Sequence, residues 1–175
     1  MELASFGKLF GYFIASILAG MIPAKNPFFA SADLAYEPAI IGIFAERKET
    51  LDSDTISIEK DGPNAYRLTL YGGGAATEFG ARLFRLKISG AWKPVYYFLD
   101  LTPRRRAGHR VAAGAAHLAL MIDWEGATLR LWPYRADLLA KESPVLPGTT
   151  GALRRFLRRA VLRDEFENPL SLSRR

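Results

Sequence analysis

The chain contains no cysteine among its 175 residues. This absence excludes disulfides, thiolate metal sites, cysteine nucleophiles and lipid attachment through cysteine. If the protein is exported, its core must therefore be stable without covalent cross-links.

Histidine is nearly as scarce, since His109 and His117 are the only two, and no acidic cluster accompanies them at metal-ligand spacing. We therefore expect no metal site and no cofactor, and we expect His117 on an outward strand face. No Gly-x-Ser-x-Gly elbow is present, and Gly72-Gly73-Gly74 leads into a strand pattern without the lysine of a phosphate loop. A hydrolase that uses His117 with Asp100 and a serine, or Asp100 with Asp123, is the least supported class of function.

Only one long apolar run is present, Leu9 to Ile22, and it is followed by Pro23 and by Ala30-Ser31-Ala32. Its fourteen residues are few for a membrane span of about 20 but suit the core of a signal peptide. An Ala-x-Ala ending is what signal peptidases accept, so Ala30 and Ala32 mark the expected cleavage site. We predict a signal peptide or N-terminal membrane helix over residues 1–32 and a single domain over residues 33–175.

An alternative is that this N-terminal helix is not cleaved. Its apolar residues follow helical spacing, which suits a helix in the membrane interface or one packed on the domain. The export hypothesis places the protein in the periplasm or cell envelope, and the alternative anchors it to the membrane through residues 9–22.

From Ile40 onward, short alternating segments are separated by Gly, Pro, Asn and Asp, which is typical of an antiparallel meander. The predicted strands are Ile40–Ala45, Thr55–Lys60, Tyr66–Tyr71, Thr77–Ile88, Val95–Leu101, His117–Asp123 and Thr128–Trp132. We predict a mainly β fold, an antiparallel curved sheet or small lipocalin-like barrel of about seven strands, because closure removes exposed edges. A change of inward parity near Leu83 and Phe84 predicts a β-bulge.

The chain changes period near its C-terminal end. Thr149 or Thr150 can cap a helix whose apolar residues recur at spacings of three and four, with arginines on the opposite face. The apolar residues are Leu153, Phe156, Leu157, Ala160 and Val161. We expect this C-terminal amphipathic helix to pack across the sheet or the barrel mouth, and the alternative is a basic helix that rests on an anionic membrane or a partner.

The order of these features resembles small, uncharacterised exported proteins of bacteria, many of them lipoproteins. The resemblance spans roughly Ile40 to Phe166. It rests on Ile41-Gly42-Ile43-Phe44, on Tyr66-Arg67-Leu68-Thr69-Leu70, on Glu78 to Leu86 with Tyr97-Phe98-Leu99-Asp100-Leu101, and on His117-Leu118 with Leu129-Arg130-Leu131. It implies a β-rich exported domain and brings no catalytic motif, and the lipid-bearing cysteine of such proteins is absent here.

The net charge of +6 and the pI of 9.7 permit attraction to anionic lipids or polymers. Nucleic acid is not an expected partner, because no aromatic residues interleave the cluster Arg104 to Arg106. The candidate anion contacts are Arg104, Arg105, Arg106, Arg154, Arg155, Arg158 and Arg159. They support a basic membrane-surface or polyanion-binding adaptor as an alternative function.

Apolar residues on both parities of Val95–Leu101 favour another function, which we prefer to the adaptor. We expect a non-enzymatic protein that binds a small apolar ligand or an envelope partner through aromatic side chains. The candidate surface consists of Trp92, Tyr96, Phe98 and Trp132.

Overall fold

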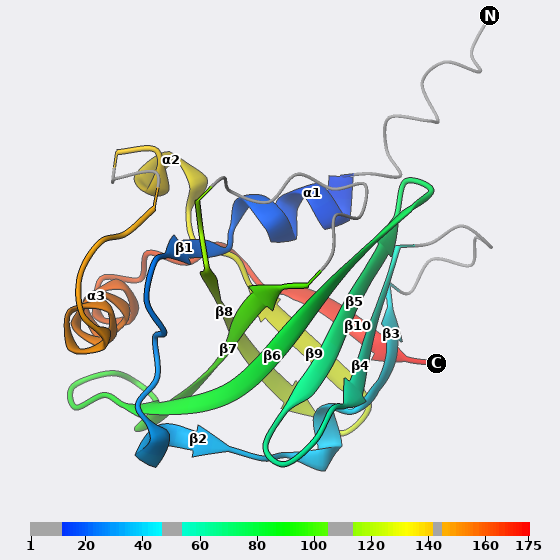
Figure 1. Cartoon of the computed structure of the whole chain (residues 1–175), viewed down its shortest axis with the longest axis horizontal. Helices are drawn as coiled ribbons and strands as arrows, with labels where there is room; N and C mark the ends of the chain where they lie inside the picture. The colour runs from blue at the N-terminus through cyan, green and yellow to red at the C-terminus, as the bar shows by residue number, and fades with distance from the viewer. Residues whose placement is uncertain (1–11, 47–53, 105–113, 142–144) are drawn as a thin grey trace, which may run out of the picture.

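The computed structural model of the chain describes residues 12–46, 54–104, 114–141 and 145–175 (Figure 1). The helices are α1 (Tyr12–Ala19), α2 (Ala136–Leu139) and α3 (Thr150–Leu162), with short 3-10 turns η2 (Ser31–Asp33) and η3 (Pro38–Ile40). The strands are β1 (Ile22–Ala24), β2 (Leu34–Ala35), β3 (Gly42–Ala45), β4 (Thr55–Lys60), β5 (Tyr66–Gly72), β6 (Ala75–Lys87), β7 (Val95–Pro103), β8 (His117–Glu125), β9 (Thr128–Trp132) and β10 (Leu170–Arg174).

Eight of the described strands form a closed antiparallel barrel. Their order is β8, β7, β6, β5, β4, β3, β10 and β9, and β9 pairs back with β8. The predicted mainly β, antiparallel fold is confirmed, and each predicted strand is present within a few residues of its expected bounds. The predicted count of about seven was one too low, because β10 enters between β3 and β9 and closes the barrel.

The barrel interior is filled by one apolar cluster that includes Leu68, Phe79 and Leu99. Four side chains of the N-terminal segment belong to the same cluster: Phe13, Ile14, Ile17 and Met21. An eight-stranded barrel is just narrow enough for side chains to fill it. The helix α1 therefore contributes to the core at one end of the barrel, where it lies across the upper rim in Figure 1.

A polar contact also holds α1 on the barrel. Asp54, next to the start of β4, accepts the backbone N–H of Ile14 at 3.3 Å, and such N–H groups in the first turn have no partner inside the helix. Gly72 of β5 lies close by, since a Cβ atom there would approach Asp54 Oδ1 to 2.4 Å and Ile14 Cγ1 to 2.7 Å. A residue without a side chain is therefore needed at position 72 for α1 to approach β5.

The next segment, residues 22–29, covers part of the outer wall. The strand β1 pairs antiparallel with β8 in the register Ile22↔Ala119, and the backbone of Pro23 accepts a hydrogen bond from the N–H of Leu146 at 2.8 Å. Phe28 is completely buried. Cleavage after Ala32 stays a prediction, but a chain that began at residue 33 would lack all of these core contacts.

No helix in the described ranges is long and apolar enough to cross a membrane.

The predicted β-bulge is wrong. The strand β6 keeps one continuous register with β5 and another with β7 across its thirteen residues. Leu83 points into the barrel, whereas Phe84 and Leu86 belong to a second apolar cluster on the outer wall, under α3. The apolar pattern changes parity because a second apolar layer, formed by residues 22–29 together with α3, covers the outer face of the second half of β6.

The helix α3 begins with Thr149 as its N-cap, whose side chain accepts the N–H of Ala152. The buried side chains are Leu153, Phe156, Leu157 and Ala160. They pack on the outer wall in the second cluster, so the helix lies across the sheet and not across the barrel mouth (Figure 1). The helix is not the last element of the chain, because β10 follows it.

Candidate functional site

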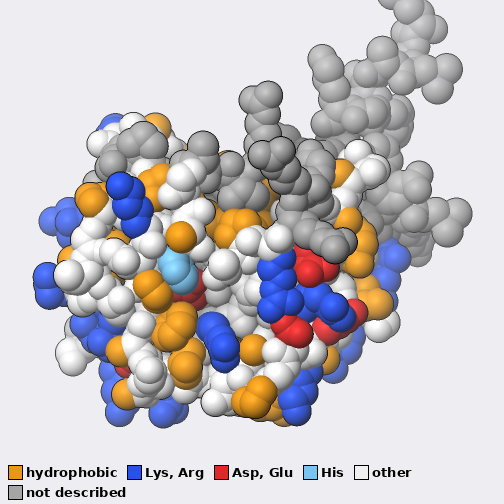
Figure 2. Space-filling view, in the orientation of Figure 1, with side chains coloured by type: hydrophobic (Ala, Val, Ile, Leu, Met, Phe, Trp, Pro, Cys, Tyr) orange, Lys and Arg blue, Asp and Glu red, His pale blue; other side chains and the backbone are white. Residues whose placement is uncertain are grey.

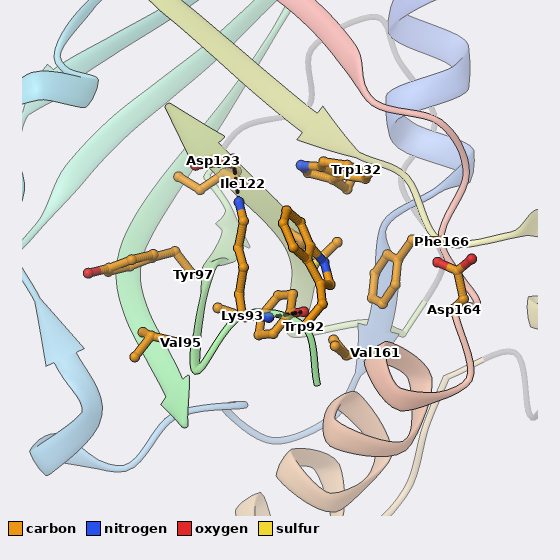
Figure 3. A pocket seen from close by; sticks show the side chains of 12 residues that line it. Trp92, Lys93, Val95, Tyr97, Ile122, Asp123, Trp132, Val161, Asp164 and Phe166 are labelled. Atoms are coloured by element: carbon orange, nitrogen blue, oxygen red, sulfur yellow. Dashed lines mark hydrogen bonds and ion pairs between the residues drawn. The ribbon is translucent and has the colours of Figure 1, made fainter. Parts of the chain in front are cut away.

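A pocket of about 90 Å³ lies on the outside of the barrel, beside the loop that joins β6 to β7 (Figure 3). Its walls come from four separate parts of the chain: that loop with the start of β7, the strand β8, the end of β9, and the segment from the last turn of α3 to Phe166. We call it the aromatic pocket, because Trp92, Tyr96, Tyr97, Trp132 and Phe166 all line it.

The loop wall of the pocket is fixed by charged contacts. Lys93 Nζ lies 3.0 Å from Asp123 Oδ2 and 4.8 Å from the ring centroid of Trp92. Arg130 Nη1 reaches the same oxygen of Asp123 at 3.4 Å. These contacts tie the loop to β8 and leave the Trp92 side chain 81% exposed.

The remaining wall is apolar. Met121 of β8, Trp132 at the end of β9 and Val161 of α3 line it, and Figure 3 shows the Trp132 and Phe166 rings on the same side of the cavity. Phe166 is positioned by an edge-on contact with Tyr134, with ring centroids 5.6 Å apart. An apolar cavity with an ion pair at one edge suits the burial of an apolar group.

The structure brings together three of the four aromatic residues predicted from the sequence. Trp92, Tyr96 and Trp132 line the pocket. Phe98 does not, because it is fully buried under α3, where its ring stacks on Phe84 at 5.5 Å. The alternation of β7 places Phe98 on the same outer face as Tyr96, but the sequence did not show that a helix covers this part of the face.

The candidate anion contacts do not form a single patch. Arg104 pairs with Asp61, and Arg105 and Arg106 lie outside the described residues. On α3, Arg155 and Arg159 are exposed, and the guanidinium of Arg159 lies 5.1 Å from the Phe156 ring centroid.

The other two predicted arginines of α3 line a second hollow. Arg154 Nη2 lies 2.8 Å from Asp33 Oδ2, and Arg158 lines the hollow beside it. Two basic residues of β6, Arg85 and Lys87, line it too and were not predicted. Both are polar positions of an ordinary alternating strand, so no sequence signal distinguished them.

The structure also brings Asp100 and His117 together, two residues that were catalytic candidates from the sequence. Asp100 is buried, its Oδ1 lies 2.7 Å from His117 Nδ1, and its Oδ2 accepts the backbone N–H of Phe28 at 2.9 Å. Asp123 is not part of this group, since it pairs with Lys93 and Arg130. Asp100 therefore links β7, β8 and the N-terminal segment.

Burial raises the pKa of Asp100, although the hydrogen bonds from Phe28 and His117 oppose the shift. A raised pKa in the folded state adds stability below the ordinary carboxyl pKa of about 3.9, and this stability is lost as pH rises through the folded value. The free energy of unfolding of the wild type minus that of Asp100→Asn should therefore decrease as pH rises from about 4 to 7.

Urea unfolding of both chains at several pH values measures this difference. Repeating the pair in a His117→Gln background removes the titration of the imidazole from the comparison. A difference that stays constant with pH in that background would show that the Asp100 pKa is not raised.

Within the described parts of the chain, no three His, Asp or Glu side chains come together to hold a metal ion. No protein-family model, curated protein or solved structure matches the chain. The fold and the site alone define this protein as a closed antiparallel β-barrel with an apolar pocket on its outer wall.

Proposed function

We propose that this protein is a non-enzymatic binding protein and that its aromatic pocket accepts a small apolar ligand of about the size of one ring. The observation that carries the proposal is that Trp92 and Tyr96, four residues apart, meet Trp132 and Phe166 from distant parts of the chain around one cavity. Aromatic walls with few polar groups are typical of small-molecule sites.

The volume of the pocket limits the size of the ligand. At about 90 Å³ it is smaller than the roughly 300–1,000 Å³ of pockets that hold drug-sized molecules. The pocket therefore suits a small aromatic ring system no larger than indole, or a short alkyl chain.

The exposed Trp92 supports the same proposal. A tryptophan that is 81% exposed leaves a large apolar surface in water, and each Å² removed from water contributes about 25 cal/mol. A ligand seated between Trp92 and Val161 would cover part of this surface. The ion pair of Lys93 with Asp123 already fixes the backbone of the loop, so little of it has to be ordered on binding.

Equilibrium dialysis of the full chain with indole tests the proposal. We expect saturable binding with a Kd of about 0.1–1 mM, as suits a ligand of few atoms. Val161→Phe places a ring inside the pocket and should weaken binding by at least about tenfold, a loss of roughly 1.4 kcal/mol.

Ile43→Phe is the matched control. Ile43 is 51% exposed on β3 and does not line the pocket, so this variant adds the same ring elsewhere. Wild-type affinity is expected for it. Equal affinity of all three chains, or no saturation, would rule out the aromatic pocket as the binding site, and the Tm of each variant verifies that it is folded.

A further inference from the structure

The second hollow, of about 310 Å³, is lined by Ala32, Asp33, Arg85, Lys87, Arg154 and Arg158. We call it the cationic hollow, because four of these six residues are basic and only one is acidic. It lies beside the middle of α3, at Arg154 and Arg158, whereas the aromatic pocket lies near the last turn of this helix. Figure 2 shows basic side chains gathered along the left edge of this face, where Figure 1 places α3.

Spacing keeps each pair of basic side chains on one side of its own element, and the hollow is lined by both pairs. Arg85 and Lys87 are two apart on β6 and so point to the same side of the strand. Arg154 and Arg158 are four apart on α3 and so lie on the same side of the helix. A regular strand and a regular helix therefore each present a pair of cations to one hollow.

Asp33 fixes one of these cations. Arg154 Nη2 lies 2.8 Å from one oxygen of Asp33 and 2.9 Å from the other. Asp33 ends η2, and the next residue begins β2, which pairs with β6 in the register Leu34↔Phe84. The hollow is thus held by three elements that are linked to one another.

The charges in the hollow are not balanced by the protein. Among the described residues, Arg85, Lys87 and Arg158 form no ion pair. Arg154 Nε is buried and has no hydrogen-bond acceptor. The three unpaired side chains and the guanidinium of Arg154 are all positively charged and surround one space, so they repel each other. A multivalent anion bound between them would remove that repulsion.

We propose that the cationic hollow binds a phosphate-bearing anion with at least two negative charges. Guanidinium groups form paired hydrogen bonds to phosphate oxygens, and an ammonium adds a compact positive charge. The volume is about ten times the roughly 30 Å³ share of one water molecule, which leaves room for a diphosphate. The phosphate belongs either to a free small molecule or to a lipid headgroup, since both present the same oxygens.

Titration of the full chain with sodium pyrophosphate at low ionic strength tests the proposal. Because a ligand of the folded state raises Tm, we expect Tm to increase with pyrophosphate concentration and isothermal calorimetry to show saturation. Arg158→Gln, and separately Arg85→Gln combined with Lys87→Gln, should each weaken binding by at least about fivefold.

Arg155→Gln is the matched control, because it removes the same charge from the exposed face of the same helix. We expect it to change the affinity by less than about twofold, because salt screens the interaction between an exposed charge and an anion bound in the hollow. Equal weakening by Arg155→Gln and Arg158→Gln would overturn the proposal, since it would show a response to net charge alone.

Vesicle sedimentation separates the two sources of phosphate. Vesicles of phosphatidylcholine with phosphatidic acid are compared with phosphatidylcholine alone, using the same variants. Binding to the acidic vesicles that needs Arg158 but not Arg155, without binding of free pyrophosphate, assigns the site to a lipid headgroup. Binding of pyrophosphate assigns it to a soluble phosphate, and failure of both probes overturns the proposal.

Discussion

Removing residues 1–32 should leave a chain that does not fold. Six large side chains of this segment are buried: Phe13, Ile14, Ile17, Met21, Ile22 and Phe28. At about 1.5–3 kcal/mol for each, their loss removes about 9–18 kcal/mol, which is comparable to the whole stability of about 5–15 kcal/mol of a typical domain. Circular dichroism and thermal unfolding of residues 33–175 should show no cooperative transition.

A pair of substitutions within α1 controls for the length of the deletion. Ile17→Asp places a charge in the barrel interior and should destabilise the fold strongly, whereas Ala15→Asp changes an exposed position of the same helix and should be tolerated. The same reasoning bears on the predicted cleavage after Ala32. Recovery from cells of a folded chain whose intact mass corresponds to residues 33–175 would contradict this part of the account.

Deleting residues 170–175 should open the barrel and cause aggregation. The strand β10 pairs with β3 on one side and with β9 on the other, so its removal leaves two unpaired edges. It also removes Leu172, which is buried in the barrel interior and faces Leu129 across the pair. Size-exclusion chromatography should show large oligomers, and thermal unfolding should lose its cooperativity.

Adjacent residues of β10 provide the control for this deletion. Leu172→Asp directs a charge into the core and should destabilise by about 3 kcal/mol or more, since a buried unpaired charge is among the most costly changes. Ser171→Asp lies on the exposed side of the same strand and should change the stability by no more than about 0.5 kcal/mol. Similar stabilities of the two variants would show that β10 does not close the barrel.

The alternation of polar and apolar residues was sufficient to predict seven of the barrel strands. In Tyr66–Gly72, for example, Leu68 and Leu70 face the interior as the period of two requires. The strand β10 also alternates, with Leu170 and Leu172 separated by serine, but it is only five residues long and follows a helix. Its partners, β3 and β9, are distant in sequence, so local pattern gave no reason to add it.

The errors in the sequence interpretation arise where a second layer covers the barrel. Near Leu83 and Phe84 both faces of β6 are apolar because α3 packs on the outside, and a period of two cannot separate that case from a bulge. The same layer buries Phe98 completely, whereas Tyr96 is 9% exposed and lines the aromatic pocket. The packing of this second layer, which residues 22–29 and Phe166 form together with α3, was therefore the missing information at both positions.

The contacts between charged side chains depend on how strands and helices pair and pack, which the sequence did not define. Asp100 and His117 come together because β7 and β8 pair in the register Asp100↔Ala119, which brings His117 diagonally beside Asp100. Arg85 and Lys87 meet Arg158 only because α3 packs beside the end of β6. Trp92 and Trp132 were candidates because the apolar residues on both parities of Val95–Leu101 favoured an aromatic binding surface nearby.

A ¹H–¹⁵N correlation spectrum of the labelled full chain, titrated with unlabelled indole, shows directly whether the aromatic pocket binds a ligand. The indole N–H signals of Trp92 and Trp132, which line the aromatic pocket, should shift and saturate together. The signal of Trp124, which packs against Tyr97 but does not itself line the pocket, should move less. Equal shifts of all three signals, or none, would contradict the account.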